Sequence, residues 1–139
     1  MKSTIIADTS GLISLVSVTD SNHAKALATG KKLSAVSGSL IVPSDVYSET
    51  LNIAGKKLGH MSAIGTAEML FANNTFLVAD STEKIRDRAF ELFKKQPESV
   101  SFTDCVVMAT ADHFNTKNIF GFDETFRKNG YLRVGVDEK

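Results

Sequence analysis

Four carboxylates in the sequence have the spacing and context of a metal-binding site. Asp8 directly follows a short apolar run, and Asp123 follows another one near the end of the chain. Glu49 and Asp104 lie in segments of helical pattern, each on a face that also carries apolar residues. Carboxylates buried near one another need a proton or a cation, and oxygen ligands suit Mg²⁺ or Mn²⁺. Such a site can activate water for phosphodiester hydrolysis.

Three of these acids also stand where a helix is expected to begin. Asp8 and Asp123 each precede a helical segment, and Asp104 is the fourth residue of Ser101-Phe-Thr-Asp104, a variant of the capping box. Taken singly, each of the three is as readily a cap as a ligand. Glu49 lies in the middle of its helix and has no such structural explanation. Because one side chain can both cap a helix and bind a metal, the two interpretations stay open.

Short strands alternate with helices along the chain. The predicted strands cover residues 4–7, 40–42, 75–78, 118–121 and 131–134. The predicted helices begin at about residue 11, at residue 80, and cover 23–33, 44–58, 61–72, 103–114 and 123–128. This alternation predicts a three-layer α/β/α sandwich with a central, mostly parallel sheet of about five strands. In such sheets ligands bind at the carboxyl ends of the strands, near the point where the strand order reverses.

Two local patterns are expected to be structural. Asp80-Ser-Thr-Glu83 has the form of a full capping box, so Asp80 serves as a comparison acid without a role in the site. The helices at 44–58 and 61–72 are expected to form a hairpin. Its second helix carries apolar residues at helical spacing, which we interpret as a core stripe. These residues are Met61, Ile64, Ala67 and Phe71.

The composition fits a single globular domain. The 139 residues are 42% hydrophobic and 23% charged, which is ordinary for such a domain. Sixteen basic and 16 acidic residues balance to a formal charge of zero, so any contact with nucleic acid must be local. We expect one domain over residues 1–135 and a charged C-terminal tail over residues 136–139.

The single cysteine and the first residues bear on the cellular compartment. Cys105 excludes an intramolecular disulfide and fits a reducing environment. The apolar stretch before Asp8 is too short for a secretory signal, and no run has the length of a membrane span. We therefore expect a cytoplasmic protein without a membrane segment.

The segments that carry the acids, in this order, resemble the PIN-domain family, and especially the VapC-type toxin ribonucleases of type II toxin–antitoxin systems. The family's first segment, with its acid in an Asp-Thr/Ser-Ser context, is similar to the opening IIADTSGLISL, and its second-acid segment is similar to VPSDVYSETLN. Its third-acid helix resembles SFTDCVVMATADHFN, and its closing strand, acid and amphipathic end resemble IFGFDETFRKNGYLRV. The resemblance covers nearly the whole chain.

This resemblance implies an endoribonuclease that depends on Mg²⁺ or Mn²⁺. The implied catalytic acids, which are also the implied metal ligands, are Asp8, Glu49, Asp104 and Asp123. The hydroxyls that would help to hold the acids or the bound waters are those of Ser10 and Thr103. The resemblance further implies RNA as the substrate, a homodimer, and a small antitoxin protein that blocks the site, often with an arginine.

The sequence departs from the family next to the fourth acid. Glu124 adds a second acid beside Asp123, where many relatives have a basic or neutral residue, so either of the two could face the site. Basic pairs along the chain could contact RNA phosphates, although a solvated helix surface explains most such pairs. Arg127 and Lys128 are the best candidates for phosphate contacts because they lie close in sequence to Asp123.

Three other functions are weighed against a toxin ribonuclease. The chain could be a PIN-type RNA-processing nuclease that is not a toxin, or a catalytically silent PIN-fold module that binds RNA or protein; intact acids argue against the second. A receiver-like phosphoacceptor domain also places an aspartate after an early strand. That chemistry requires paired acids after the first strand and a lysine after a late one, whereas IIADTSG has one acid and IFGFDE has no lysine.

Overall fold

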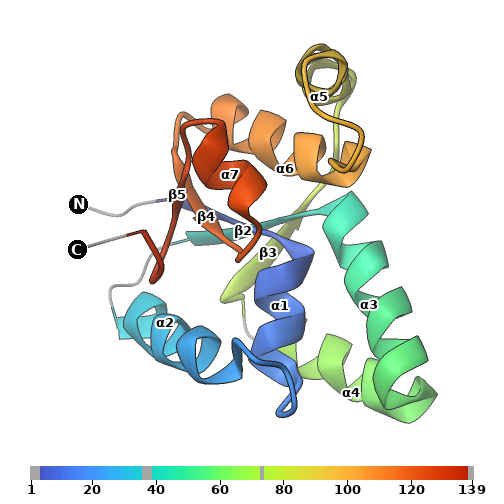
Figure 1. Ribbon diagram of the computed structural model, residues 1–139. Helices are drawn as coiled ribbons and strands as arrows, with labels where there is room; N and C mark the ends of the chain where they lie inside the picture. The colour runs from blue at the N-terminus through green and yellow to red at the C-terminus, as the bar shows by residue number, and fades with distance from the viewer. Residues whose placement is uncertain (1–3, 36–38, 73, 138–139) are drawn as a thin grey trace.

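A five-stranded parallel sheet forms the centre of the structure, a computed structural model that describes residues 4–35, 39–72 and 74–137 (Figure 1). Its strands are β1 (Thr4–Ala7), β2 (Ser39–Pro43), β3 (Phe76–Ala79), β4 (Asn118–Phe120) and β5 (Leu132–Arg133). All four pairings are parallel. Part of the predicted tail, 138–139, lies outside the described residues.

Helices cover both faces of this sheet. On one side lie α5 (Glu83–Lys94), α6 (Phe102–His113) and α7 (Glu124–Lys128), and on the other lie α1 (Thr9–Val16) and α2 (His23–Ala35) (Figure 1). The helices α3 (Ser44–Leu58) and α4 (His60–Phe71) form the predicted hairpin, which extends from the carboxyl end of β2. The predicted three-layer α/β/α fold is therefore confirmed.

The core lies between the central strands and α6. Ile6 of β1 and Ile119 of β4 are fully buried, because both faces of these strands are covered by helices. Every residue from Cys105 to Ala111 in α6 is buried as well. A helix that is apolar all round must lie inside the molecule, so this burial fixes the position of the Asp104 end of α6 over the sheet.

The strand order is β3-β2-β1-β4-β5, and it reverses between β1 and β4. From β1 the chain first builds the sheet toward β3, and then returns to add β4 and β5 on the other side of β1. Receiver-like domains have the order 2-1-3-4-5, so this topology excludes the receiver-like alternative. Asp8 directly follows the carboxyl end of β1, and Asp123 lies three residues after the end of β4.

The capping box predicted at Asp80 is wrong. Helix α5 begins at Glu83, and its N-cap is Thr82, whose side-chain oxygen accepts a hydrogen bond from the amide of Ile85 at 3.3 Å. Thr82 caps the helix in place of Asp80 because it directly precedes the first helical residue, where its hydroxyl reaches a free amide of the first turn. Asp80 is exposed.

The predicted core stripe of α4 is also wrong in part. Met61 is 76% exposed and Ile64 is 41% exposed, whereas the buried residues are Ala63, Thr66 and Leu70. The reason is the close approach of α3 and α4, since a Cβ on Gly55 would lie 3.9 Å from that of Ala63. Close packing selects small side chains for the buried face and turns the larger ones outward.

The helices of the three described ranges include none that is long and apolar enough to cross a bilayer.

Candidate active site

Four elements bring the four predicted acids to one edge of the sheet. Asp8 is the N-cap of α1, Asp123 is the N-cap of α7, Asp104 lies in the first turn of α6, and Glu49 lies in α3. The charge of Asp104 interacts unfavourably with each of the other three. The structure thus places the other three acids around Asp104, at the reversal of strand order.

Asp8 is the most deeply buried acid, with 4% of its surface exposed. Its Oδ2 accepts hydrogen bonds from the amide of Ser10 at 3.1 Å and from the Ser10 hydroxyl at 2.7 Å. Burial raises the pKa of Asp8 to about 7; the Ser10 bonds offset part of this rise, and the charge of Asp104 adds to it. The hydrogen bonds from Ser10 therefore do not fully offset the cost of burying the ionised carboxylate of Asp8.

Asp104 forms a capping box with Ser101, as the sequence pattern suggested. The Asp104 amide donates to Ser101 Oγ at 3.1 Å, and the Ser101 amide donates to Asp104 Oδ2 at 3.2 Å. Partial burial raises the pKa of Asp104, opposed by the bonds with Ser101 and reinforced by the charges of Asp123 and Glu49. The cap and the acid cluster thus share one side chain.

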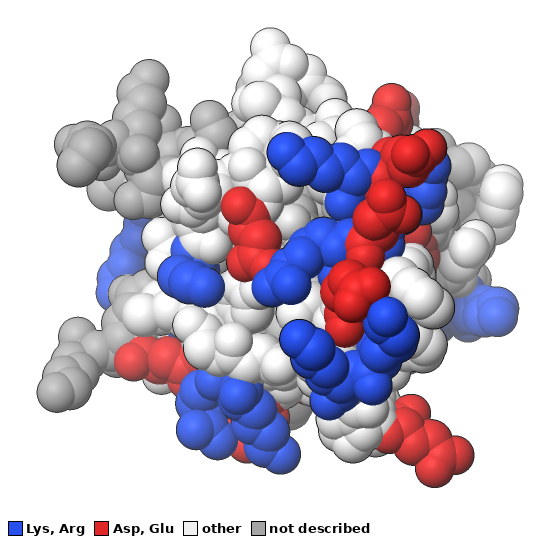
Figure 2. All heavy atoms as spheres, turned by 90° about the horizontal axis from the view of Figure 1, so that it is seen from above, with Lys and Arg blue, Asp and Glu red and all other residues white. Residues whose placement is uncertain are grey.

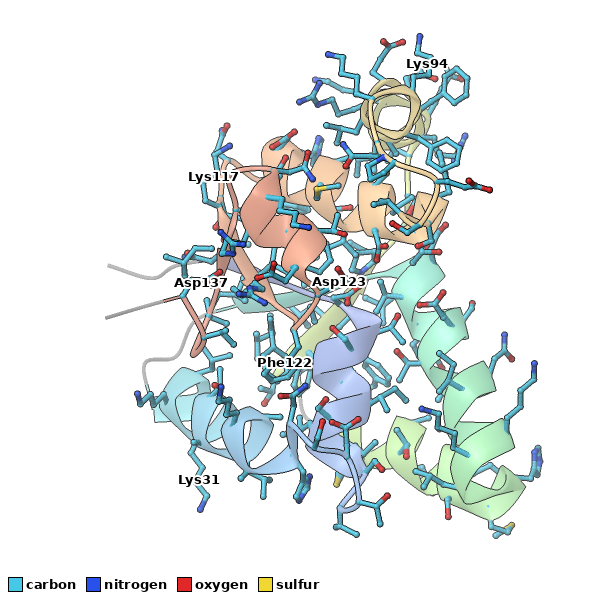
Figure 3. The ribbon with its side chains drawn as sticks, in the orientation of Figure 1. Lys31, Lys94, Lys117, Phe122, Asp123 and Asp137 are labelled. Carbon is cyan, nitrogen blue, oxygen red and sulfur yellow. The ribbon has the colours of Figure 1, made fainter. Side chains whose placement is uncertain are left out.

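Asp123 and Glu124 point to different partners. Asp123 Oδ1 accepts from the Thr125 amide at 2.9 Å, while Glu124 forms two hydrogen bonds with Arg127, at 3.0 and 3.1 Å. Figure 3 shows Asp123 at the start of α7, on the side of α1 and α3. Asp123, the one of the two whose charge acts on Asp104, is therefore the acid that faces the cluster.

Glu49 and Thr103 line a shallow groove beside the cluster. Both side chains are partly exposed, and the groove has a volume of about 660 Å³. Its remaining lining residues are Ser44, Asp45, Ser48, Asn52, Ile53 and Lys56. Thr103 thus lines the same groove as Glu49, whereas Ser10 forms a direct hydrogen bond with Asp8.

Gly121 allows β4 to approach Asp8, a role that the sequence analysis missed. A Cβ on Gly121 would lie 2.9 Å from the Cβ of Asp8 and 3.2 Å from Ser10 Oγ, so no larger residue fits. The next amide along the chain, that of Phe122, donates to Ser10 Oγ at 2.9 Å. Ser10 therefore joins Asp8 to the loop that carries Asp123.

Arg133 has a role inside the molecule and is not free to contact phosphates. Its guanidinium donates to the Phe122 carbonyl at 3.0 Å and pairs with Asp137 at 2.8 Å, and the residue is 9% exposed. Arg133 belongs to β5, and Asp137 lies on the side of this strand, away from Asp123 (Figure 3). The pair thereby holds Phe122, the residue directly before Asp123, on the side of β5. No pattern in the sequence connects the tail residue Asp137 with a buried arginine.

The basic residues predicted to touch RNA lie at the surface. Arg127 is half exposed but paired with Glu124, and Lys128 is exposed. On the face covered by α5, α6 and α7, basic and acidic side chains are interspersed (Figure 2). The structure thus leaves Lys128 more available than Arg127 for a contact with phosphate.

The donor set suits a hard divalent cation, although the acids are not closed around a common point. Among the residues the structure describes, no three His, Cys, Asp or Glu side chains are already arranged to hold a metal. The caps occupy one carboxylate oxygen each, Oδ2 of Asp104 and Oδ1 of Asp123. The hydroxyl of Thr9, next to Asp8, is buried with no partner within the described ranges. Burial, and to a smaller extent repulsion between the acids, raises the pKa values of Asp8 and Asp104, and a bound cation would offset both effects.

Comparisons with known proteins agree with this geometry. Residues 5–130 match the model of the PIN domain family. Among solved structures, the chain is similar to the Mycobacterium tuberculosis toxin VapC20, described as a sarcin–ricin loop cleaving toxin. The TM-score is 0.80 at 25% sequence identity, and the match covers 94% of this chain and 98% of VapC20. No curated protein sequence gives a significant match. The chain belongs to the PIN domain family.

Proposed function

We propose that the protein is an endoribonuclease that depends on Mg²⁺ or Mn²⁺ and acts as the toxin of a VapBC-type toxin–antitoxin pair. The proposal depends mainly on one observation, the convergence of four acids on one edge of the sheet: Asp8, Glu49, Asp104 and Asp123. The charge of Asp104 interacts unfavourably with the charge of each of the other three. The similarity to the RNA-cleaving toxin VapC20 over 94% of the chain supports both the reaction and the biological class.

The four acids would hold the cation, which supplies a Lewis acid that activates water and neutralises charge on the phosphodiester. Ser10 keeps the Asp8 carboxylate in place through two hydrogen bonds to Oδ2. The amides of Ser101 and Thr125 hold one oxygen each of Asp104 and Asp123, which leaves the orientation of each carboxylate fixed before a ligand arrives. Preorganised carboxylates do not have to move when charge develops on the substrate.

The proposed partners are RNA, a small antitoxin and a second copy of the chain. An antitoxin that inserts an arginine would meet four clustered carboxylates, which favour a cation. The α3–α4 hairpin exposes Met61, Ile64 and Met69, apolar side chains of the kind that protein interfaces cover. We place the protein in the cytoplasm, where the buried free thiol of Cys105 would stay reduced.

Cleavage of RNA tests this proposal. Wild type, Asp8→Asn and Glu49→Gln are incubated with total RNA and with an RNA oligonucleotide of the sarcin–ricin loop, in Mg²⁺, Mn²⁺ or EDTA. We expect cleavage by the wild type only with metal, and at least a hundredfold loss in both variants. If the wild type cuts neither RNA, and binds Mn²⁺ no better than Asp8→Asn does, the protein is a silent binding module instead.

The choice between a toxin and a processing nuclease requires a cellular readout. Expression of the wild type, but not of Asp8→Asn, is expected to arrest growth and to cleave an essential RNA. Maturation of an RNA precursor without growth arrest would favour the processing nuclease.

A further inference from the structure

The groove that starts at Glu49 and Thr103 continues along one face of α3. The groove is lined by Ser48, Glu49, Asn52 and Lys56. Asn52 follows Ser48 by four residues and Glu49 by three, and Lys56 follows Asn52 by four, so all of them lie on one side of the helix. Lys56 lies seven residues beyond Glu49, or ~10 Å along the helix axis. The groove is therefore a polar track that leads away from the proposed cleavage site.

The two ends of this groove differ in charge. At the end near the start of α3 lies Asp45, which accepts a hydrogen bond from the Ser81 hydroxyl at 2.7 Å and has no ion pair with a basic residue in the part of the chain the structure describes. At the other end lies Lys56, the one basic residue among the lining residues of the groove that the structure describes. A polyanion in this groove is repelled at Asp45 and attracted at Lys56.

Lys56 is available for such a contact. It is exposed, and no ion pair joins it to an acid within the described ranges. Between Lys56 and Glu49 the groove offers the Ser48 hydroxyl and the Asn52 amide, and both residues are exposed. Lysine, serine and asparagine side chains are common partners of phosphate and sugar oxygens in nucleic-acid complexes.

We propose that the RNA strand leaves the cleavage site along α3, with Lys56 bound to a phosphate outside the scissile bond and with Ser48 and Asn52 bound to the intervening backbone. This inference rests on the proposed function, since it names the substrate's path from the same site. It assigns Lys56, Ser48 and Asn52 a role in binding and not in the chemical step.

A stabilising effect on helix α3 is a simpler explanation for Lys56, and a matched control variant tests it. Lys56 and Lys57 both lie in the last turn of α3, where a cation stabilises the helix dipole. Lys57 is equally exposed but does not line the groove. Any effect through helix stability should therefore be shared by the two lysines, and any effect through RNA should belong to Lys56 alone.

The test compares Lys56→Gln, Lys56→Arg and Lys57→Gln on the RNA that the wild type cuts. We expect Lys56→Gln to raise KM about fivefold at unchanged kcat, and to lower the salt slope of log kcat/KM by ~0.7, the value for one phosphate contact to a single strand. Lys56→Arg should restore both quantities, and Lys57→Gln should match the wild type. Equal KM values and equal salt slopes in Lys56→Gln and Lys57→Gln would overturn the proposal.

Binding separates a failure of this inference from a failure of the proposed function. The same lysine changes are made in Asp8→Asn, and binding of a labelled single-stranded RNA is measured by fluorescence anisotropy in Mg²⁺. If the wild type cuts no RNA but Lys56→Gln alone weakens binding in this background, the groove remains an RNA site while the nuclease proposal fails. RNA binding that does not depend on Lys56, or the absence of RNA binding, would overturn the proposal that the strand follows this groove.

Discussion

The hydroxyl of Ser10 donates a 2.7 Å hydrogen bond to Oδ2 of Asp8, the most buried acid of the site. The hydroxyl oxygen of Ser10 also accepts a hydrogen bond from the amide of Phe122 at 2.9 Å. One side chain thus ties the end of β1 to the loop after β4, across the point where the strand order reverses. This link joins Asp8 to the residue directly before Asp123.

Removal of the Ser10 hydroxyl should therefore affect both stability and cleavage. We expect Ser10→Ala to lower the free energy of unfolding by about 1–2 kcal/mol, because the Phe122 amide loses its partner. We expect kcat to fall about tenfold, because Asp8 loses one of its two bonds from Ser10. Urea denaturation and cleavage assays measure the two effects, with the exposed Ser99→Ala as the control. Wild-type kcat in Ser10→Ala would show that Asp8 needs no support.

The buried carboxyl of Asp8 should make the metal-free protein less stable as the pH rises. Below pH 3.8 Asp8 is protonated in both the folded and the unfolded chain, and it does not contribute. Between pH 3.8 and about 7 the unfolded chain releases this proton while the folded chain keeps it, so stability falls through this window. The loss is on the order of 4 kcal/mol if the whole rise in pKa is expressed.

Asp8→Asn isolates this contribution. In EDTA we expect the free energy of unfolding of Asp8→Asn to increase relative to that of the wild type as the pH rises from 4 to 7. Addition of Mg²⁺ at neutral pH should stabilise the wild type and leave Asp8→Asn unchanged, since only the carboxylate binds the cation. Urea denaturation at several pH values provides the comparison. A stability difference that does not change with pH would mean that Asp8 is ionised in the fold without penalty.

Gly121 should tolerate no side chain. In Gly121→Ala the new Cβ would lie 2.9 Å from the Cβ of Asp8 and 3.1 Å from Cε2 of Phe126, so β4 must move away from β1. We expect a loss of about 1–3 kcal/mol in unfolding free energy and a large drop in kcat. The control is Gly65→Ala in α4, where a Cβ meets no atom within 4 Å. Gly65→Ala should stabilise the fold by about 0.5–1 kcal/mol. Equal effects of the two changes would show that Gly121 does not lie close to Asp8.

Arg133 should act on the site through the Phe122 carbonyl. We expect Arg133→Ala to destabilise the fold by about 2 kcal/mol, because Asp137 loses its partner and the carbonyl loses a donor. Arg127→Ala breaks a solvent-exposed pair with Glu124 and should have a much smaller effect on stability, because water and salt screen the two charges. Thermal unfolding distinguishes the two. If Arg127→Ala proves the more harmful, the buried pair does not hold this segment.

The layers of the fold were predictable because each element has a local signal. The apolar runs that became β1 and β4 and the apolar helix α6 can be stable only in the interior, and their alternation requires a parallel sheet. The predicted meeting of Asp8 and Asp123 follows from the same topology, because carboxyl ends of parallel strands share one edge. Glu49 and Asp104 lie on helices, and their inclusion depended on their apolar helix faces and on the family resemblance. These expectations depend on patterns within a few residues and on one topological rule.

The misplaced details depend on contacts between distant segments. The sequence does not reveal that α4 approaches α3 through Ala63, so the larger Met61 and Ile64 were placed inside. The choice between Asp123 and Glu124 was open because it depends on the direction of α7, although the pair of Glu124 with Arg127 at i+3 was a usable signal. The burial of Arg133 depends on Asp137, whose return to the sheet has no local pattern.

The most direct test of the four-acid site is the cleavage rate as a function of Mg²⁺ concentration in single acid-to-amide variants. The wild type is compared with Asp104→Asn, which removes the central charge, and with Asp80→Asn, an exposed acid after β3. The account predicts cleavage by the wild type that saturates with Mg²⁺, the same curve for Asp80→Asn, and at least a hundredfold lower rate for Asp104→Asn. Equal rates for Asp104→Asn and Asp80→Asn, or cleavage that persists in EDTA, would contradict it.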